Sequence, residues 1–106
     1  MQLRNYRWSP VYEAAEETLV KLLQAKKIKT ERWTAEPGQL FAAHAHDYDK
    51  QLWCAEGSII LTVGEQHISL QAGDALELPA NTIHSAVAGM NGCACYEAHS
   101  QPPTNH

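Results

Sequence analysis

Residues 38–57 read GQLFAAHAHDYDKQLWCAEG and place His44 and His46 two positions apart in a segment typical of a β-strand. Side chains two positions apart on a strand project from the same face, roughly 6.5–7 Å from one another. The two imidazoles therefore converge on one point. Because neutral imidazole is a good ligand for zinc, iron, nickel and copper, the stretch predicts two ligands of a divalent transition-metal site.

A second stretch supplies a third histidine. Residues 73–88 read GDALELPANTIHSAVA, with a turn signal at Pro79 and His84 five positions after it. A strand that begins near His84 and lies beside the first histidine pair would bring three imidazoles to one site. The sequence therefore predicts that His84 completes a set of three metal ligands with His44 and His46.

The spacing within both stretches resembles that of the cupins, whose two motifs are G-x5-H-x-H-x3,4-E-x6-G and G-x5-P-x-G-x2-H-x3-N. The matching positions are Gly38, His44, His46 and Gly57 in the first motif and Gly73, Pro79 and His84 in the second. The resemblance covers about Glu36 to Ala88, and the short segment between the motifs is similar to that of small single-domain cupins. It implies a jelly-roll β-barrel whose three histidines and one glutamate hold a divalent metal, with iron, nickel, zinc and manganese as candidates. The resemblance therefore implies His44, His46 and His84 as metal ligands in this chain.

The chain departs from the first motif at the glutamate, whose position is occupied by Lys50. An ammonium repels a nearby divalent cation, so Lys50 is either an entrance residue in solvent or a group that binds an acidic substrate or exchanges a proton. The longer spacing instead makes Gln51 a candidate metal ligand. A flat strand that points His46 inward points Lys50 inward and Gln51 outward, whereas a bulge before Leu52 would reverse that order. Lys50, Gln51 and Tyr48 are the ligand-binding candidates.

The second motif also departs from the family pattern at two positions. Asn81 replaces a glycine and Ala88 replaces an asparagine. Asparagine accepts the left-handed backbone conformation more readily than most residues. Asn81 is therefore a tolerable replacement for glycine in a turn of this kind.

Short runs of β-forming residues separated by turn signals follow Ile28 and predict an all-β barrel. The expected strands are Ile28–Ala35, Gln39–His46, Gln51–Ala55, Ser58–Val63, His67–Leu70, Ala75–Leu78, His84–Val87 and Cys93–Ala98. Ahead of them, Ser9-Pro10 and apolar residues at helical spacing predict one amphipathic helix from about Pro10 to Lys26. The expected organisation is an N-terminal strand and helix extension (1–27), a cupin barrel (28–99) and a disordered tail (100–106).

The composition fits one small globular domain. The chain has 106 residues, of which 44% are hydrophobic and 19% charged, a balance that excludes a disordered chain. A net charge of -4 disfavours binding to nucleic acid or to anionic lipid, and no apolar run is long enough to cross a bilayer. The odd number of cysteines, three, does not build a disulfide framework and indicates a cytoplasmic location.

A homodimer is expected because a barrel of this size has little core of its own. The N-terminal helix together with Trp8 and Trp33 could cover the sheet of a partner. Pairing through sheets is also what the resemblance to cupins implies.

The expected function is that of a metal-binding cupin that binds or transforms a small organic molecule inside the barrel. If the protein is an enzyme, a dioxygenase or an isomerase would fit three imidazoles that leave coordination positions open. The alternative is a non-catalytic ligand-binding or sensor cupin whose metal site lost its full ligand set when glutamate became Lys50. Fold alone does not choose between them.

Overall fold

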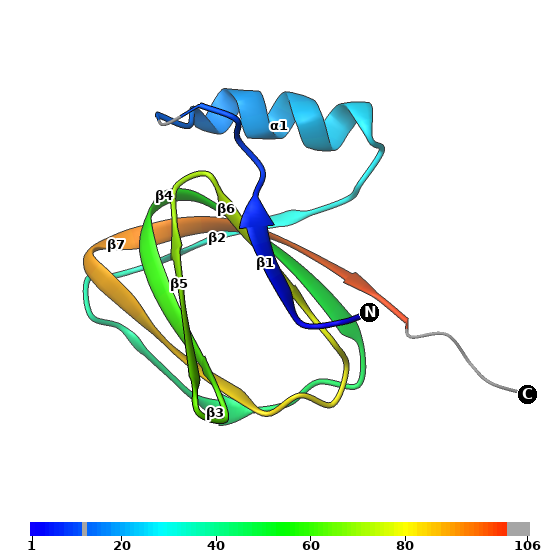
Figure 1. Ribbon diagram of the computed structural model, residues 1–106. Coiled ribbons are helices and arrows are strands. Elements are labelled where there is room, and N and C mark those ends of the chain that lie inside the picture. The colour runs from blue at the N-terminus through cyan, green and yellow to red at the C-terminus, as the bar shows by residue number, and fades with distance from the viewer. Residues whose placement is uncertain (12, 102–106) are drawn as a thin grey trace, which may run out of the picture.

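The computed structural model describes residues 1–11 and 13–101, which form a ring of antiparallel strands with one helix outside it (Figure 1). The elements are β1 (Arg4–Arg7), α1 (Glu16–Ala25), β2 (Glu31–Ala35), β3 (Leu40–His44), β4 (Asp49–Val63), β5 (Gln66–Gln71), β6 (Asp74–Leu78) and β7 (His84–Ser100). The strand order is β1-β6-β4-β7-β2, with β3 against β7 and β5 against β4. The predicted all-β barrel with one N-terminal helix is confirmed.

Strands β4 and β7 are longer than predicted, and each spans two expected strands. The segments that separate those expected strands include Glu56-Gly57 and Gly89–Gly92. They lie within continuous strands, where the pairing of β4 with β7 shifts register. Gly57 and Gly92 have φ values of 66° and 71°, and a Cβ on Gly57 would lie 2.0 Å from the carbonyl oxygen of Gly92. The glycines therefore bend two strands that cross closely. Such bends let β4 and β7 contribute to both sides of the barrel.

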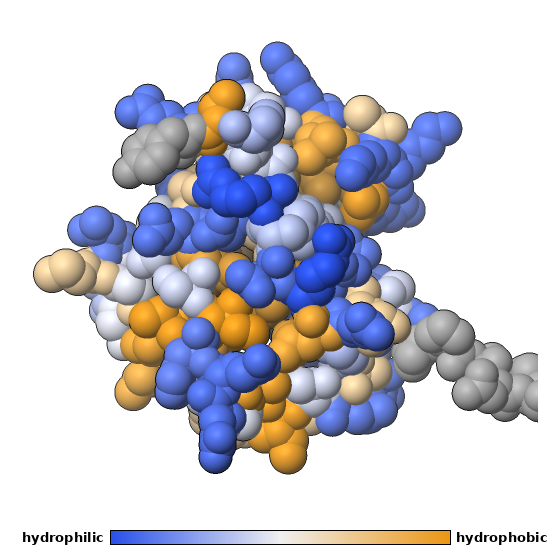
Figure 2. Space-filling view, viewed as in Figure 1, coloured by the Kyte–Doolittle hydropathy of each residue, from blue (hydrophilic) through white to orange (hydrophobic). Residues whose placement is uncertain are grey.

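Two groups of buried side chains hold the fold together. The barrel interior contains Ala35, Leu52, Cys54, Ile59, Leu61, Leu70, Leu76, Leu78, Ala88, Cys93 and Cys95. The second group packs the helix against the outside of the sheet and contains Trp8, Leu19, Leu23, Trp53, Ala55 and Ala75. All three cysteines are buried and free, as expected for small apolar fillers. Figure 2 shows hydrophobic side chains gathered over the ring of strands and hydrophilic ones around much of the outline.

The helix starts later than predicted, at Glu16 instead of Pro10. The backbone N–H groups of Trp8 and Ser9 both donate to the carbonyl of Gly73, and the Ser9 hydroxyl accepts from the N–H of Val11 at 3.3 Å. These contacts tie the segment after β1 to the barrel, so the Ser9-Pro10 start signal is overridden by tertiary packing. Glu16 and Glu17 lie in the first turn of the helix, where a negative charge favours the helix dipole, and its last turn contains no basic residue.

The chain ends depart in detail from the expected division. Ser100 is the last residue of β7, so it belongs to the barrel and not to the tail. The remainder of the expected disordered tail, residues 102–106, lies outside the described residues. Within residues 1–11 and 13–101, no helix has the length and hydropathy that a membrane span requires.

Trp8 and Trp33 do not lie on a free surface, so the predicted dimer contact through these side chains is wrong. Trp8 is 8% exposed and packs in the cluster beneath the helix. Trp33 lines the interior of the barrel and donates its indole N–H to Glu97. Each indole therefore stabilises its own chain.

Replacing Trp8 with phenylalanine is expected to lower the free energy of unfolding by about 2 kcal/mol. The indole N–H donates to the carbonyl of Cys54 at 2.9 Å, and this bond is buried. The variant loses the donor and leaves a small void, although the N–H of Gly73 still donates to the same carbonyl. Urea unfolding measures the change. Val11→Ala, at an exposed position nearby, serves as the control, and equal stability of Trp8→Phe and wild type would contradict this role.

Candidate functional site

Three histidines meet where β3 ends and β7 begins. His44 is the last residue of β3, His46 lies in the following loop, and His84 is the first residue of β7, directly paired with His44. Their ligand atoms all lie within 4.8 Å of one another. The ring centroid of His44 lies 4.6 Å from that of His46 and 4.4 Å from that of His84. Nitrogens that bind one zinc lie roughly 2.0–2.1 Å from it and therefore at most about 4.2 Å from one another, so the cluster is close to the size that a single ion requires.

Two of the three rings are fixed by backbone carbonyls. The Nδ1 atom of His44 lies 2.6 Å from the carbonyl oxygen of Ala42, and that of His84 lies 2.9 Å from the carbonyl oxygen of Thr82. Because a carbonyl only accepts, both Nδ1 atoms carry the proton and donate it. The Nε2 atoms are then left with free lone pairs. This is the arrangement that commonly orients histidines toward a metal.

The turn before His84 joins the two halves of the site. Asn81 has a φ of 61°, the left-handed conformation that asparagine tolerates in place of glycine. Its N–H donates to the carbonyl of His46 at 2.6 Å, and the N–H of Ala80 donates to the carboxylate of buried Asp49 at 2.8 Å. The turn is thereby attached to the segment that carries His46 and to the start of β4.

The surroundings of His46 and His84 favour neutral imidazoles. Burial lowers the pKa of His84 below its ordinary value, although its hydrogen bond to Thr82 acts in the opposite direction. Burial, followed by the charge of Lys50, lowers the pKa of His46. Since a metal binds the neutral form, both groups are in the binding form near neutral pH.

Two of the histidines open onto a cavity of about 130 Å³ inside the barrel. Its polar lining residues are His44, His84, Lys50 and Glu97. The apolar ones are Trp33, Phe41, Leu52, Ile59, Leu61 and Ala86. Lys50 is on the inner face of β4, as strand parity predicts, and its side chain is only 13% exposed. The pairing of Lys50, Gln51 and Leu52 with β6 is regular, so Gln51 lies on the opposite face. Gln51, expected as a possible metal ligand and ligand contact, therefore points away from the cavity and is not among its lining residues.

Sequence reasoning missed Glu97, a carboxylate inside the barrel. Glu97 accepts a hydrogen bond from the Trp33 indole at 3.1 Å and lies 3.4 Å from the Lys50 ammonium. His99 donates to its other oxygen. Burial raises the pKa of this carboxyl, but the His99 hydrogen bond and the charges of Lys50 and His99 outweigh burial, so the pKa lies below its usual value. In the sequence, the only indication was that Glu97 lies two positions after Cys95 and so shares its face of the expected strand.

Tyr48 does not line the cavity and instead stacks between two histidines. Its ring centroid lies 4.7 Å from that of His46 with an interplanar angle of 13°, and 4.0 Å from that of His99. It therefore supports the orientation of His46 from outside the three-histidine group. Its expected role as a ligand-binding residue stays a prediction.

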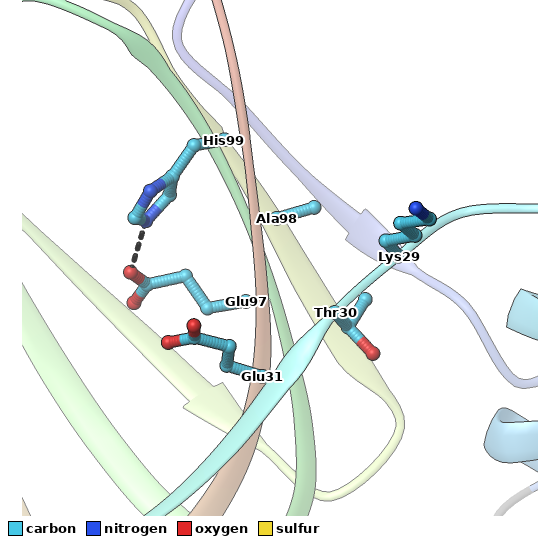
Figure 3. A pocket seen from close by; sticks show the side chains of 6 residues that line it. All are labelled: Lys29, Thr30, Glu31, Glu97, Ala98 and His99. Atoms are coloured by element: carbon cyan, nitrogen blue, oxygen red, sulfur yellow. Dashed lines mark hydrogen bonds and ion pairs between the residues drawn. The ribbon is translucent and has the colours of Figure 1, made fainter.

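A second, more open pocket of about 310 Å³ lies beside β2 and the end of β7 (Figure 3). In Figure 3 the side chains of Glu31, Glu97 and His99 lie on one side of these strands, and Ala98 lies on the other. Glu31 and Glu97 are direct cross-strand partners. Because Glu97 lines both spaces, its side chain lies between the interior cavity and this outer pocket.

Comparison with known proteins agrees with the barrel and its histidines. Residues 31–92, more than half of the chain, match the family described as Cupin domain. The chain is a cupin. It is 39% identical over 49 residues to quercetin 2,3-dioxygenase of Bacillus subtilis, an alignment that covers 45% of this chain but only 14% of that protein.

Solved cupin structures resemble between 64% and 95% of this chain in the two cases that follow. A cupin-2 domain protein from Shewanella frigidimarina is 26% identical, with a TM-score of 0.58 over 64% of this chain and 65% of that one. A cupin superfamily protein from Desulfitobacterium hafniense is 16% identical, with a TM-score of 0.63 over 95% of this chain and 79% of that one. The second likeness shows the fold alone. Within this cupin, the histidine cluster is compatible with metal binding.

Proposed function

We propose that this cupin binds a divalent transition metal through His44, His46 and His84 and binds or transforms a small organic molecule in the barrel. The observation that carries the proposal is a cluster of three imidazoles whose ligand atoms lie within 4.8 Å of one another. Backbone carbonyls orient the rings of His44 and His84, and both rings line an apolar cavity. Iron, nickel, zinc and manganese all suit imidazole ligands.

A bound metal would supply Lewis-acid polarisation of a ligand oxygen or, if it is iron, activation of dioxygen. The chain's own residues have other roles. Apolar walls that include Trp33 and Phe41 exclude water, while Lys50 and Glu97 orient the ligand. The relative named quercetin 2,3-dioxygenase supports oxygenase chemistry as the first reaction class to test.

A second candidate function is a non-catalytic binding or sensor cupin. The observation that favours it is the Lys50–Glu97 ion pair at the place where the family motif has its glutamate. A carboxylate already paired with an ammonium is a poor metal ligand, so the site would hold its metal by three histidines only.

Metal analysis of the purified protein, before and after incubation with zinc, nickel, manganese or iron(II) and desalting, tests the metal proposal. One equivalent of bound metal per chain supports it, and no retained metal under any condition refutes it. Oxygen consumption by the iron-loaded protein with thiols, diols and keto acids then separates the two candidates. Turnover supports the enzyme, whereas binding without turnover supports the sensor.

A homodimer and a cytoplasmic location belong to the same proposal. Free, buried cysteines support a reducing compartment. For the dimer, the support is an apolar outer surface formed by β3, β4 and β7, where Leu40 is 78% exposed and Ile60 is 39% exposed. A second copy would cover these side chains through the sheet.

Replacing Ile60 with glutamate is therefore expected to convert a dimer into a monomer at micromolar concentration. A buried unpaired carboxylate at the centre of an apolar contact destabilises the association strongly. Light scattering coupled to gel filtration gives the mass. Val11→Glu, also at an exposed apolar position, is the matched control, and a wild-type protein that is already monomeric would refute the dimer.

A further inference from the structure

We propose that the interior cavity selects a single-ring organic monoanion, with its ring between the apolar walls and its anionic oxygen at Lys50. The inference rests on the proposed function, because it names the class of molecule that this site takes. It combines the size of the cavity, the nature of its walls and the charge placed inside it.

The volume of the cavity limits the ligand to about one ring. A closed apolar cavity of about 150 Å³ in another protein binds benzene, and the cavity here measures about 130 Å³. A six-membered ring therefore fills it, with its anionic substituent at Lys50. The second ring of a fused molecule would not fit between these walls and would lose the contacts that they offer.

The walls suit a flat ring. Trp33 and Phe41 lie edge to face, with ring centroids 5.7 Å apart, and both line the cavity. Leu52, Ile59 and Leu61 supply the remaining apolar surface. Aromatic rings prefer such edge or offset contacts with other aromatic rings. An extended polar chain would leave its hydrogen-bonding groups unsatisfied against these walls.

Lys50 supplies the preference for a negative charge. An ammonium carries three N–H donors, and among the described residues only Glu97 lies within ion-pair distance of it, at 3.4 Å. The Glu97 carboxylate also accepts from Trp33 and His99, so its oxygens are shared among three donors. The ammonium therefore keeps donors for a ligand in the cavity. A carboxylate or phenolate can accept them, and a neutral amide binds them less strongly.

The test uses benzoate, benzamide and 2-naphthoate, titrated by calorimetry into chelator-treated protein and into zinc-loaded protein. Benzoate is expected to bind at least about tenfold more tightly than benzamide, since hydrogen bonds to charged groups are the stronger ones. The naphthoate, equally charged but larger, is expected to bind at least about tenfold more weakly than benzoate. Equal affinity for benzoate and benzamide, or for benzoate and naphthoate, would overturn the inference.

Three variants test whether Lys50 supplies the positive charge that binds the anion. Lys50→Gln is expected to weaken benzoate binding about tenfold and to leave benzamide binding unchanged. Glu97→Gln keeps the shape of the side chain and removes the competing charge, so benzoate should bind more tightly, a gain that a misfolded protein cannot show. Lys29→Gln removes the same charge at an exposed residue of the outer pocket and should have no effect. Unchanged benzoate affinity in Lys50→Gln or in Glu97→Gln counts against the inference.

The two protein forms separate this inference from the metal proposal. Benzoate binding that depends on Lys50 in a protein that takes up no zinc would support the anion site and refute the metal site. Zinc uptake without selective benzoate binding would do the reverse.

Discussion

His84→Ala is expected to weaken metal binding by more than about a hundredfold. Even substitutions of residues that only hydrogen-bond to a metal ligand lower metal affinity by about 10- to 100-fold. His84 is the most buried of the three histidines, and its ring is held by the Thr82 carbonyl. In wild type, metal at a hundred times its dissociation constant should add about 2.7 kcal/mol to the free energy of unfolding. The variant should lose this increment. Chelator competition gives the affinity, and thermal unfolding with and without metal gives the increment.

The increment matters more than the absolute stability of the variant, since removing a buried side chain also destabilises the metal-free protein. His67→Ala is the matched control. His67 is an exposed histidine that contacts Thr62 and lies outside the three-histidine group. An undiminished metal increment in His84→Ala, or an equal loss in His67→Ala, would mean that the metal binds elsewhere.

Lys50→Glu is expected to change two properties in opposite directions. Metal should bind at least about tenfold more tightly, because the substitution replaces a repelling ammonium by a carboxylate and restores the family's ligand set. The charge changes by two units, and at an effective dielectric constant near 20 a pair about 4 Å apart interacts by about 4 kcal/mol before desolvation. The metal-free variant should be less stable than wild type, because the new carboxylate faces that of Glu97, the present partner of Lys50.

Two further variants separate the loss of the positive charge from the gain of a ligand and test Gln51 as an alternative ligand. Lys50→Met removes the positive charge without adding a ligand and should give an intermediate metal affinity. Gln51→Ala should leave the affinity unchanged, since Gln51 lies on the other face of β4. A large loss of affinity in Gln51→Ala, with no gain in Lys50→Glu, would contradict the assignment of Lys50 to the site. Competitive chelator titration of all four proteins measures these differences.

The parts of the three-histidine cluster could be predicted from local sequence, and the resemblance to the cupin motifs joined them. The two-residue period of a strand paired His44 with His46, although β3 ends at His44 and His46 lies in the following loop. The turn before His84 is marked by Pro79 and by Asn81, which has a positive φ. The inward direction of Lys50 followed from the same period. The inferences about His46 and Lys50 span fewer than ten residues, whereas the position of His84 beside His44 depends on the pairing of β3 with β7.

Features that depend on distant partners could not be predicted in this way. Gly57 resembles a turn residue, yet it marks a bulge because β4 crosses β7 at Gly92. The helix start at Ser9 was displaced by hydrogen bonds to Gly73. Glu97 lies outside both motifs, and only the packing of β7 beside β4 and β2 brings it to Lys50 and Trp33. Long-range register, which a single sequence does not state, decided all three.

The metal site can be tested most directly by anomalous scattering from crystals of the zinc-loaded protein, recorded on both sides of the zinc absorption edge. The three-histidine geometry predicts one strong peak per chain, about 2.0–2.1 Å from a ring nitrogen of each of His44, His46 and His84. The peak should be absent from His84→Ala crystals prepared in the same way. Zinc bound in solution but located away from these three histidines, or no peak in crystals of protein shown to carry zinc, would contradict the site.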